Sequence, residues 1–182
     1  MAIASLSVPP GRSVRSPNEA WGTWRGWERG ISHIDLVEPR VVSLHGRQLA
    51  WSPSTSAKGV VAEAIPFPMV QDSVAFAGWL KQIKGKLVCI SMPQPTGRPD
   101  YNWKEFATEE SFEQMKNQRD AANKEWNENL ARTGYDRRTI NTALEQAGAS
   151  GLIQSQWSNA FGANKVFSAN TKKIPVIDLS LE

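Results

Sequence analysis

Residues 83–91, with the sequence IKGKLVCIS, decide the fold. Gly85 interrupts a helical pattern, and the apolar run that follows it is typical of a buried strand. The same order of a helical pattern, a glycine and an apolar run returns in ALEQAGASGLIQS, residues 143–155, where Gly148 separates the two parts. A last apolar run, KIPVIDLS at residues 173–180, follows a polar loop. These runs predict three strands in the second half of the chain.

The first half of the chain predicts further strands. Residues 31–39, ISHIDLVEP, alternate between apolar and polar side chains in the manner of a strand. Residues 40–51, RVVSLHGRQLAW, predict two short strands around a turn at His45 and Gly46. Residues 60–65, VVAEAI, predict another strand.

Three helices are predicted among these strands. Asp72 or Ser73 caps the first, Thr108 caps a second that ends at Gly134 after about twenty residues, and a third covers about 137–147. Their apolar stripes, which we expect in the core, are Phe76, Trp79, Leu80 and Ile83; Phe112, Met115, Ala122, Trp126 and Leu130; and Ile140, Ala143, Leu144 and Ala147. The mixed order of strands and helices predicts an α+β domain, in which a curved sheet or open β-barrel carries helices on its flank.

The composition is that of a soluble globular protein. The chain has 182 residues, of which 40% are hydrophobic and 21% charged, and this length suffices for one domain with a real core. The net charge is only +3 and the Lys and Arg residues are scattered, which does not favour a nucleic-acid partner. All apolar runs are too short to span a bilayer.

The N-terminal residues 1–20 are rich in Ser, Pro and Arg, and we expect them to form a flexible arm. They contain no long apolar centre, so they do not form a secretion signal as they stand, although a chain cut from a larger exported protein would look the same. Cys89 is the only cysteine, which excludes an internal disulfide.

A metal site is one interpretation of His33 and Asp35, which point to the same side of a predicted strand. A catalytic zinc ion requires about three protein ligands and an open position. The chain has only one other histidine, His45, and Cys89 lies in an apolar run where we expect it to be buried and inert. We therefore predict no metal ligand in this chain. The weaker alternative is an independent metal hydrolase built on His33, Asp35 and His45.

The sequence offers no motif for nucleophilic catalysis. It contains neither a Gly-x-Ser-x-Gly elbow nor a glycine-rich phosphate loop, so we predict no catalytic residue. The candidate binding residues are aromatic or cationic side chains in loops: Arg98, Tyr101 and Trp103 in a Pro-rich loop, and Trp157 in a polar loop. Such groups are suited to contacts with a peptide or a sugar, and the alternative is that they cover the edge of the core.

Three stretches, in order, resemble a protease-associated domain. IKGKLVCIS is similar to its opening strand, ALEQAGASGLIQS to its helix, glycine turn and strand, and KIPVIDLSLE to its closing strand. Upstream, the sequence is similar to the segment that enters this domain in bacterial di-zinc aminopeptidases and carboxypeptidases. The matching residues are Gly26-Trp27, Val37-Glu38-Pro39 and Trp51-Ser52-Pro53-Ser54-Thr55.

The resemblance implies an organisation and a role. Residues 1–20 would be the arm, 21–58 the entry segment and 59–182 the protease-associated domain, with a helical elaboration at about 109–147. The chain would be a non-catalytic accessory domain of a secreted or periplasmic zinc exopeptidase, shaping substrate access or mediating protein contacts. The resemblance assigns zinc to the catalytic domain of the same parent protein, which would be the partner of this domain. It does not extend to His33 and Asp35, because the family's own His-x-Asp zinc pair follows the inserted domain. The alternative function is a stand-alone module that binds a peptide or glycan.

Overall fold

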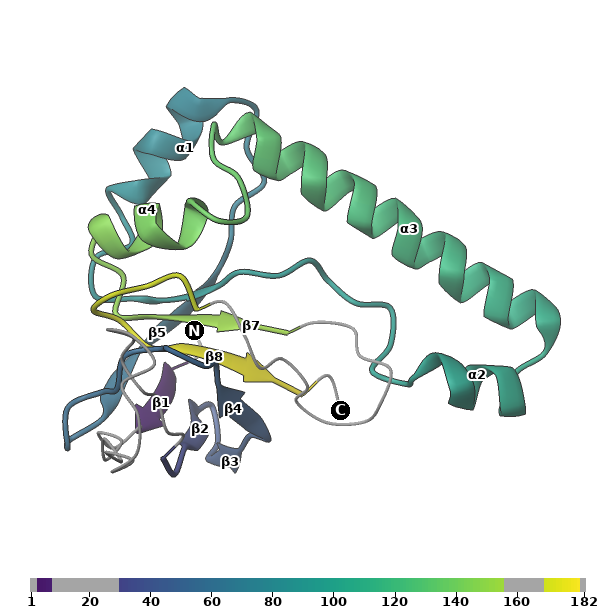
Figure 1. The fold of residues 1–182 in the computed structure, drawn as a ribbon, viewed down its shortest axis with the longest axis horizontal. Coiled ribbons are helices and arrows are strands. Elements are labelled where there is room, and N and C mark those ends of the chain that lie inside the picture. Colours follow the sequence, from purple (N-terminus) through teal and green to yellow (C-terminus); the bar gives the residue numbers. More distant parts are fainter. Residues whose placement is uncertain (1–2, 8–29, 156–168, 181–182) are drawn as a thin grey trace, which may run out of the picture.

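The computed structural model describes residues 3–7, 30–155 and 169–180, and Figure 1 shows their arrangement. The strands of these ranges are β1 (Ile3–Ser7), β2 (His33–Glu38), β3 (Val42–Ser43), β4 (Gly46–Gln48), β5 (Val60–Pro66), β6 (Leu87–Cys89), β7 (Gly151–Gln154) and β8 (Val176–Leu179). The helices are α1 (Ser73–Leu80), α2 (Asp100–Phe106), α3 (Glu109–Arg132) and α4 (Ile140–Gln146). This mixed content agrees with the predicted α+β class.

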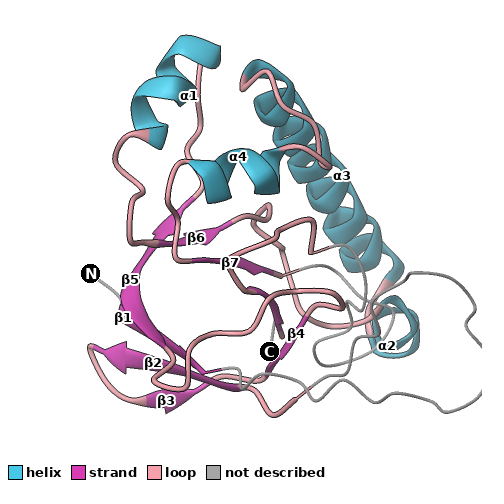
Figure 2. Ribbon diagram, turned by 60° about the vertical axis from the view of Figure 1, so that its left-hand side comes forward, coloured by secondary structure: helices cyan, strands magenta, loops and turns pink. Residues whose placement is uncertain are grey.

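The strands form one sheet in the order β3-β2-β1-β5-β6-β7-β8-β4. Strands β5 to β8 are parallel to one another, whereas β1 is antiparallel to β2 and β5, and β4 is antiparallel to β8. The sheet curls without closing into a barrel, so that β1–β4 lie opposite the helices in Figure 2.

The two short strands predicted around His45 and Gly46 are present, but they do not pair with each other. β3 pairs with β2 and β4 pairs with β8, so the two strands lie at opposite edges of the sheet. Leu44 and His45 alone connect them, because the curl of the sheet brings its edges close together. The alternating sequence pattern predicts where both strands lie, but it does not predict which strands they pair with.

The curled sheet encloses an apolar inner cluster, defined here as Ile34, Leu87, Ile153 and Ile177. These side chains come from β2, β6, β7 and β8, and Ile34 is only 4% exposed. Successive side chains of a strand point to opposite faces, so the neighbours of the inner cluster on β6–β8 point to the helices instead. Val88, Leu152 and Val176 accordingly lie in the helix-side core.

The helix-side core contains the predicted apolar stripes of α1 and α4 and the second half of α3. Asp72 caps α1 by accepting a hydrogen bond from the Ala75 N–H at 2.8 Å, as predicted. The rings of Phe67, Phe76, Trp79 and Trp126 pack together with centroids 5.3 to 5.7 Å apart. The prediction of these two helices and their buried faces is confirmed.

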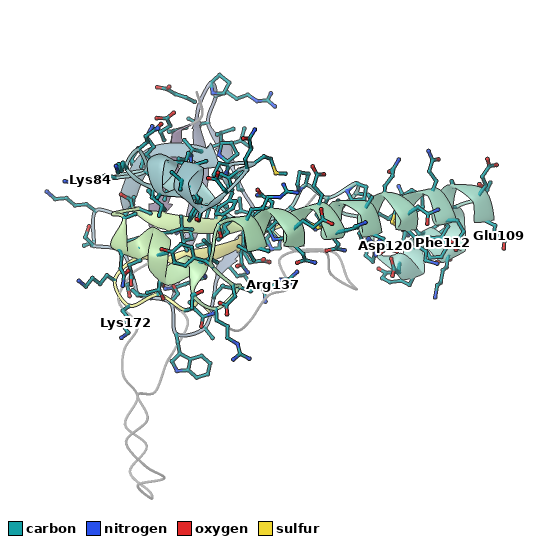
Figure 3. All side chains as sticks on the ribbon, turned by 90° about the horizontal axis from the view of Figure 1, so that it is seen from above. Lys84, Glu109, Phe112, Asp120, Arg137 and Lys172 are labelled. Carbon is teal, nitrogen blue, oxygen red and sulfur yellow. The ribbon has the colours of Figure 1, made fainter. Side chains whose placement is uncertain are left out.

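Helix α3 begins after Thr108, whose hydroxyl accepts a hydrogen bond from the Ser111 N–H at 3.3 Å. Its predicted cap and stop are confirmed, and Gly134 has the left-handed φ of +81° that glycine favours. Its predicted apolar stripe is confirmed in part: Trp126 and Leu130 join the helix-side core, whereas Phe112 and Ala122 are half-buried outside it. Only its second half lies over the sheet. Figure 3 shows the first half, from Glu109 to about Asp120, projecting beyond it.

The start of α4 and the N-terminal arm differ from prediction. The helix begins at Ile140 rather than near Arg137, because Asp136 holds a turn by accepting the N–H groups of Arg138 and Thr139 at 2.9 and 2.8 Å. Ile3–Ser7, inside the stretch expected to be a flexible arm, form a strand between β2 and β5. The remainder of that arm, residues 1–2 and 8–20, falls outside the described residues.

Glu145 connects α4 by hydrogen bonds to the segment that leads into β8. Its carboxylate oxygen Oε1 accepts hydrogen bonds from the backbone N–H groups of Lys172, Lys173 and Ile174 at 2.9, 2.6 and 3.1 Å. One charged side chain thus satisfies three consecutive backbone donors, and hydrogen bonds to charged groups are among the stronger ones.

We expect Glu145→Ala to lower the free energy of unfolding by about 2 kcal/mol, because three backbone donors lose their acceptor. Chemical denaturation of the purified chain measures this change. Gln146→Ala is the matched control, since Gln146 is the exposed neighbour on the same helix, and it should change stability by less than about 0.5 kcal/mol. Equal stability of the two variants would contradict the role of the Glu145 carboxylate.

None of the helices in the described ranges combines the length and the apolar character that crossing a membrane demands.

Candidate binding cavity

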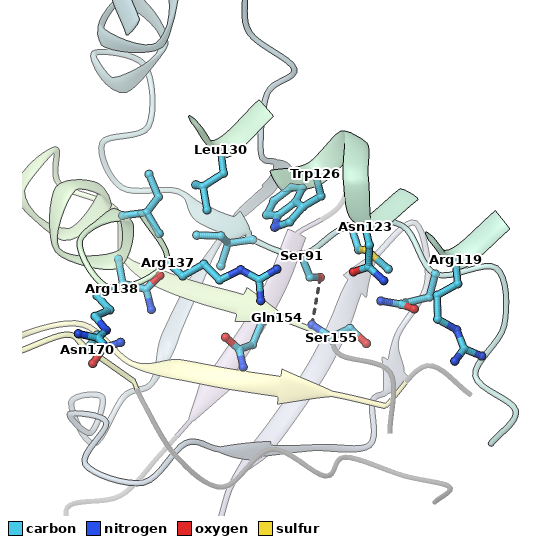
Figure 4. A pocket seen from close by; sticks show the side chains of 15 residues that line it. Ser91, Arg119, Asn123, Trp126, Leu130, Arg137, Arg138, Gln154, Ser155 and Asn170 are labelled. Carbon is cyan, nitrogen blue, oxygen red and sulfur yellow. Dashed lines mark hydrogen bonds between the residues drawn. The ribbon is translucent and has the colours of Figure 1, made fainter. Parts of the chain in front are cut away.

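A cavity of about 470 Å³ lies where β6 and β7 end, beneath α3 and the start of α4 (Figure 4). Its lining comprises Ile90, Ser91, Met92, Gln94, Arg119, Asn123, Trp126, Leu130, Arg137, Arg138, Ile140, Asn141, Gln154, Ser155 and Asn170. In sheets of parallel strands, ligands commonly bind in a crevice at the carboxyl ends of the strands. The position of this cavity makes it the leading candidate for a binding site.

The topology brings Ile90–Met92 and Gln154–Ser155 side by side. β6 and β7 are parallel neighbours, so the residues that follow them emerge at the same edge of the sheet. The Ile90 N–H bonds the Ile153 carbonyl at 2.7 Å, and the Ser155 N–H bonds the Ser91 hydroxyl at 3.1 Å. These bonds fix the floor of the cavity.

The lining offers groups that bind rather than groups that exchange protons at neutral pH. Its polar members are side-chain amides, hydroxyls and guanidinium groups, and no His, Cys, Asp, Glu or Lys is among the lining residues that the structure describes. Its apolar members, including Trp126 and Leu130, form one wall. Acid–base catalysis requires a group that titrates near the working pH. The amides, hydroxyls and guanidinium groups of the described lining can form hydrogen bonds with a bound molecule.

The three arginines of the lining differ in their partners. Arg119 forms an ion pair with Asp100 of α2, with 3.0 Å between Nη2 and Oδ1. Arg137 donates from Nη2 to the neutral Asn127 Oδ1 at 2.7 Å. Within the described residues, the ion pairs do not include Arg137 or Arg138. Arg138 also interacts electrostatically with the Asp136 carboxylate, so Arg137 is the arginine whose charge is more available to a ligand.

Gln154 is a buried amide on the floor of the cavity. It is 7% exposed, and its Nε2 atom has no hydrogen-bond partner among the described residues. The Oε1 atom of Gln94, also in the lining, is buried and unpaired as well. Buried polar groups are nearly always hydrogen-bonded, so these two amides are the groups that a bound molecule would satisfy.

Two ionisable groups near the cavity have shifted pKa values. Hydrogen bonds from the Thr139 hydroxyl and from the Thr139 and Arg138 N–H groups hold the pKa of Asp136 below its usual range. Burial raises the pKa of the Cys89 thiol, which agrees with the prediction of an inert cysteine. Cys89 packs against the inner cluster, on the face of β6 away from the cavity.

The predicted binding residues lie elsewhere. Arg98, Tyr101 and Trp103 were expected in a loop, but Tyr101 and Trp103 belong to helix α2, which Asp100 begins. The guanidinium carbon of Arg98 lies 5.9 Å from the centroid of the Trp103 ring, and Tyr101 is 53% exposed. None of these three lines the cavity.

Trp157 falls outside the described residues, as do Gly26 and Trp27. The side chain of His33 is exposed at one end of β2, and Asp35 accepts a hydrogen bond from the Ser43 hydroxyl at 2.7 Å. In the described part of the chain, no cluster of three or more His, Cys, Asp or Glu side chains is placed to hold a metal ion.

The sequence analysis did not find the cavity residues. Arg119 and Asn123 lie on the polar face of a long helix, and Arg137 and Arg138 precede a short one, where charged residues are common. Gln154 carried a usable signal, because a polar residue ends the apolar run of β7. That signal identifies the end of a strand but not which groups face it.

The sequence matches no protein-family model and no curated protein. Among solved structures, the crystal structure of a Peptidase M28 precursor from Shewanella amazonensis SB2B is similar to this chain with a TM-score of 0.44 and 16% sequence identity. The similarity covers 85% of this chain and 29% of that chain, so this chain spans less than a third of that protein's length.

Proposed function

We propose that the chain is a non-catalytic accessory domain of a secreted or periplasmic zinc exopeptidase, of the protease-associated type. In this proposal it shapes substrate access or mediates protein contacts, and a zinc peptidase domain of the same parent protein is its partner. Residues 21–58 would be the entry segment and 59–182 the inserted domain.

The observation that carries the proposal is the placement of the three segments that resemble the family. Residues 83–91, 143–155 and 173–182 contribute β6, β7 and β8, which are neighbouring parallel strands. Matches that arose by chance at three separate points in the chain would have no reason to form one contiguous block. The first two of these strands end at a cavity whose described lining carries amides, hydroxyls, guanidinium groups and apolar side chains. Both features support an accessory role.

The parent gene tests this proposal directly. We expect the reading frame at its locus to encode a zinc peptidase domain in the same polypeptide, with a glycine-rich His-x-Asp pair and a Glu-Glu pair as metal ligands. We also expect the purified chain, supplied with zinc, to release no amino acids from peptide substrates. A frame without such a domain, or turnover by the chain that fell in His33→Ala, would contradict the proposal.

The alternative is a stand-alone module that binds a peptide or glycan at α2. The contact of Arg98 with the Trp103 ring and the exposure of Tyr101 favour this alternative, because aromatic and arginine side chains are frequent anchors of binding surfaces. Trp157, which lies outside the described residues, is a further candidate contact of such a module.

A further inference from the structure

We infer that the cavity at the ends of β6 and β7 binds a small organic carboxylate. Arg137 and Arg138 would pair with the carboxylate, and the Gln154 amide would donate a hydrogen bond to another oxygen of the same molecule. This inference goes beyond the accessory role, because it assigns a ligand class to one cavity and depends on that cavity alone.

The arginines of the lining carry positive charge, which favours an anionic ligand. Of its three cations, Arg119 is neutralised by Asp100, whereas Arg137 is held by a neutral amide oxygen and neither Arg137 nor Arg138 forms an ion pair with a described residue. Figure 4 shows Arg137 reaching from the start of α4 over the end of β7. A guanidinium group presents a planar fork of donors that matches a carboxylate.

Two carboxylates lie near the cavity without lining it. Asp136 is occupied by the N–H groups of Arg138 and Thr139 and by the Thr139 hydroxyl, the last at 2.8 Å. Asp178, the partner of Gln154 in the neighbouring strand, is 1% exposed.

Gln154 supplies the second point of recognition. Its side chain is on the same face of β7 as Leu152, which is part of the helix-side core, so it points to the side on which the arginines lie. Its Nε2 atom is buried without a partner and requires an acceptor. A carbonyl or hydroxyl oxygen adjacent to the carboxylate would provide one.

The apolar wall favours an organic acid over an inorganic anion. Met92, Trp126, Leu130 and Ile140 line the cavity on the side of α3 and α4, where an inorganic phosphate would find no partner. A volume of about 470 Å³ is within the range of small-molecule sites. The free carboxyl end of a peptide and an acidic sugar both meet these requirements.

Calorimetric titration of the purified chain separates these sources. N-acetyl-leucine represents a peptide end, N-acetyl-leucinamide is its uncharged counterpart, and glucuronate represents an acidic sugar. We expect N-acetyl-leucine, glucuronate or both to bind, and the amide to bind at least about tenfold more weakly than N-acetyl-leucine if the latter binds. Binding of N-acetyl-leucine alone indicates a peptide source, and binding of glucuronate alone indicates a sugar. The inference is overturned if neither acid binds, if the amide binds as well as N-acetyl-leucine, or if inorganic phosphate binds more tightly than both acids.

Variants locate the site. Arg137→Ala should weaken binding at least about tenfold, and Gln154→Met should weaken it by a similar factor. Arg132→Ala is the matched control, because it removes the same charge from α3 outside the cavity, at a residue that pairs with Glu128 at 3.6 Å. Thermal unfolding of each variant checks that it is folded. Arg137 is exposed, so Arg137→Ala should fold and still test the site if Gln154→Met is unstable. Equal losses in Arg137→Ala and Arg132→Ala, or a loss in Tyr101→Ala alone, would overturn the cavity assignment.

Discussion

Replacing Gly46 with alanine is expected to destabilise the fold by about 3 kcal/mol, because β4 leaves no room for a side chain at this position. A Cβ atom there would lie 2.7 Å from both Ile34 Cδ1 and Leu179 Cδ2, and 2.8 Å from the backbone oxygen of Asp178. The side chains belong to strands on both sides of the curl, and the backbone oxygen cannot move without breaking the β4–β8 pairing. Chemical denaturation of the variant measures the loss.

Gly78→Ala is the matched control for this prediction. Gly78 lies within α1, where an added Cβ atom would meet nothing within 4 Å. Alanine is favoured over glycine in a helix, so this variant should be more stable than the parent by about 0.5 to 1 kcal/mol. The packing argument fails if Gly46→Ala is as stable as the parent, and opposite signs for the two variants would support it.

Replacing Asn129 with alanine is expected to destabilise the fold by about 3 to 5 kcal/mol. Asn129 lies on α3 and is 0% exposed. Its Oδ1 accepts from the Val70 N–H at 2.9 Å, and its Nδ2 donates to the Pro68 carbonyl at 2.9 Å. Alanine would leave both backbone groups without their partner and a void in the core, which is why the expected effect is large.

The same helix provides a control for Asn129. Asn117 is exposed in the first half of α3, and Asn117→Ala should change the free energy of unfolding by less than about 0.5 kcal/mol. Urea denaturation of both variants gives the comparison. A loss below about 1 kcal/mol in Asn129→Ala would show that the two backbone groups find other partners.

Much of the fold is predictable from local pattern. The ends of two helices were predicted from the caps Asp72 and Thr108 and the stop at Gly134. This was possible because capping depends on residues near one another in the chain. The partners of β3 and β4 were not predictable, since pairing depends on how far the whole sheet curls. Helix α2 was hidden because the Pro-rich sequence before Asp100 is typical of a loop, although proline is compatible with the residue that precedes a helix.

The candidate site was less predictable than the fold. Aromatic side chains led to the prediction of Arg98, Tyr101 and Trp103 as binding residues, whereas the polar groups of the cavity come from five separate segments. Arg137 is unremarkable in sequence and Gln154 marks only the end of a strand, and both come to line one cavity because β7 ends beneath the start of α4. A site assembled by topology from common residue types leaves no local motif.

The projecting half of α3 has a geometric consequence. It joins α2 to the part of α3 that packs on the sheet. Among its described side chains, Met115 is the buried one. Each residue added to or removed from this half would shift α2, with Tyr101 and Trp103, by about 1.5 Å along the axis and turn it by about 100°. The projection is thus a spacer, whose length sets where that aromatic end stands, and the ion pair of Arg119 with Asp100 links this end to the lining of the cavity.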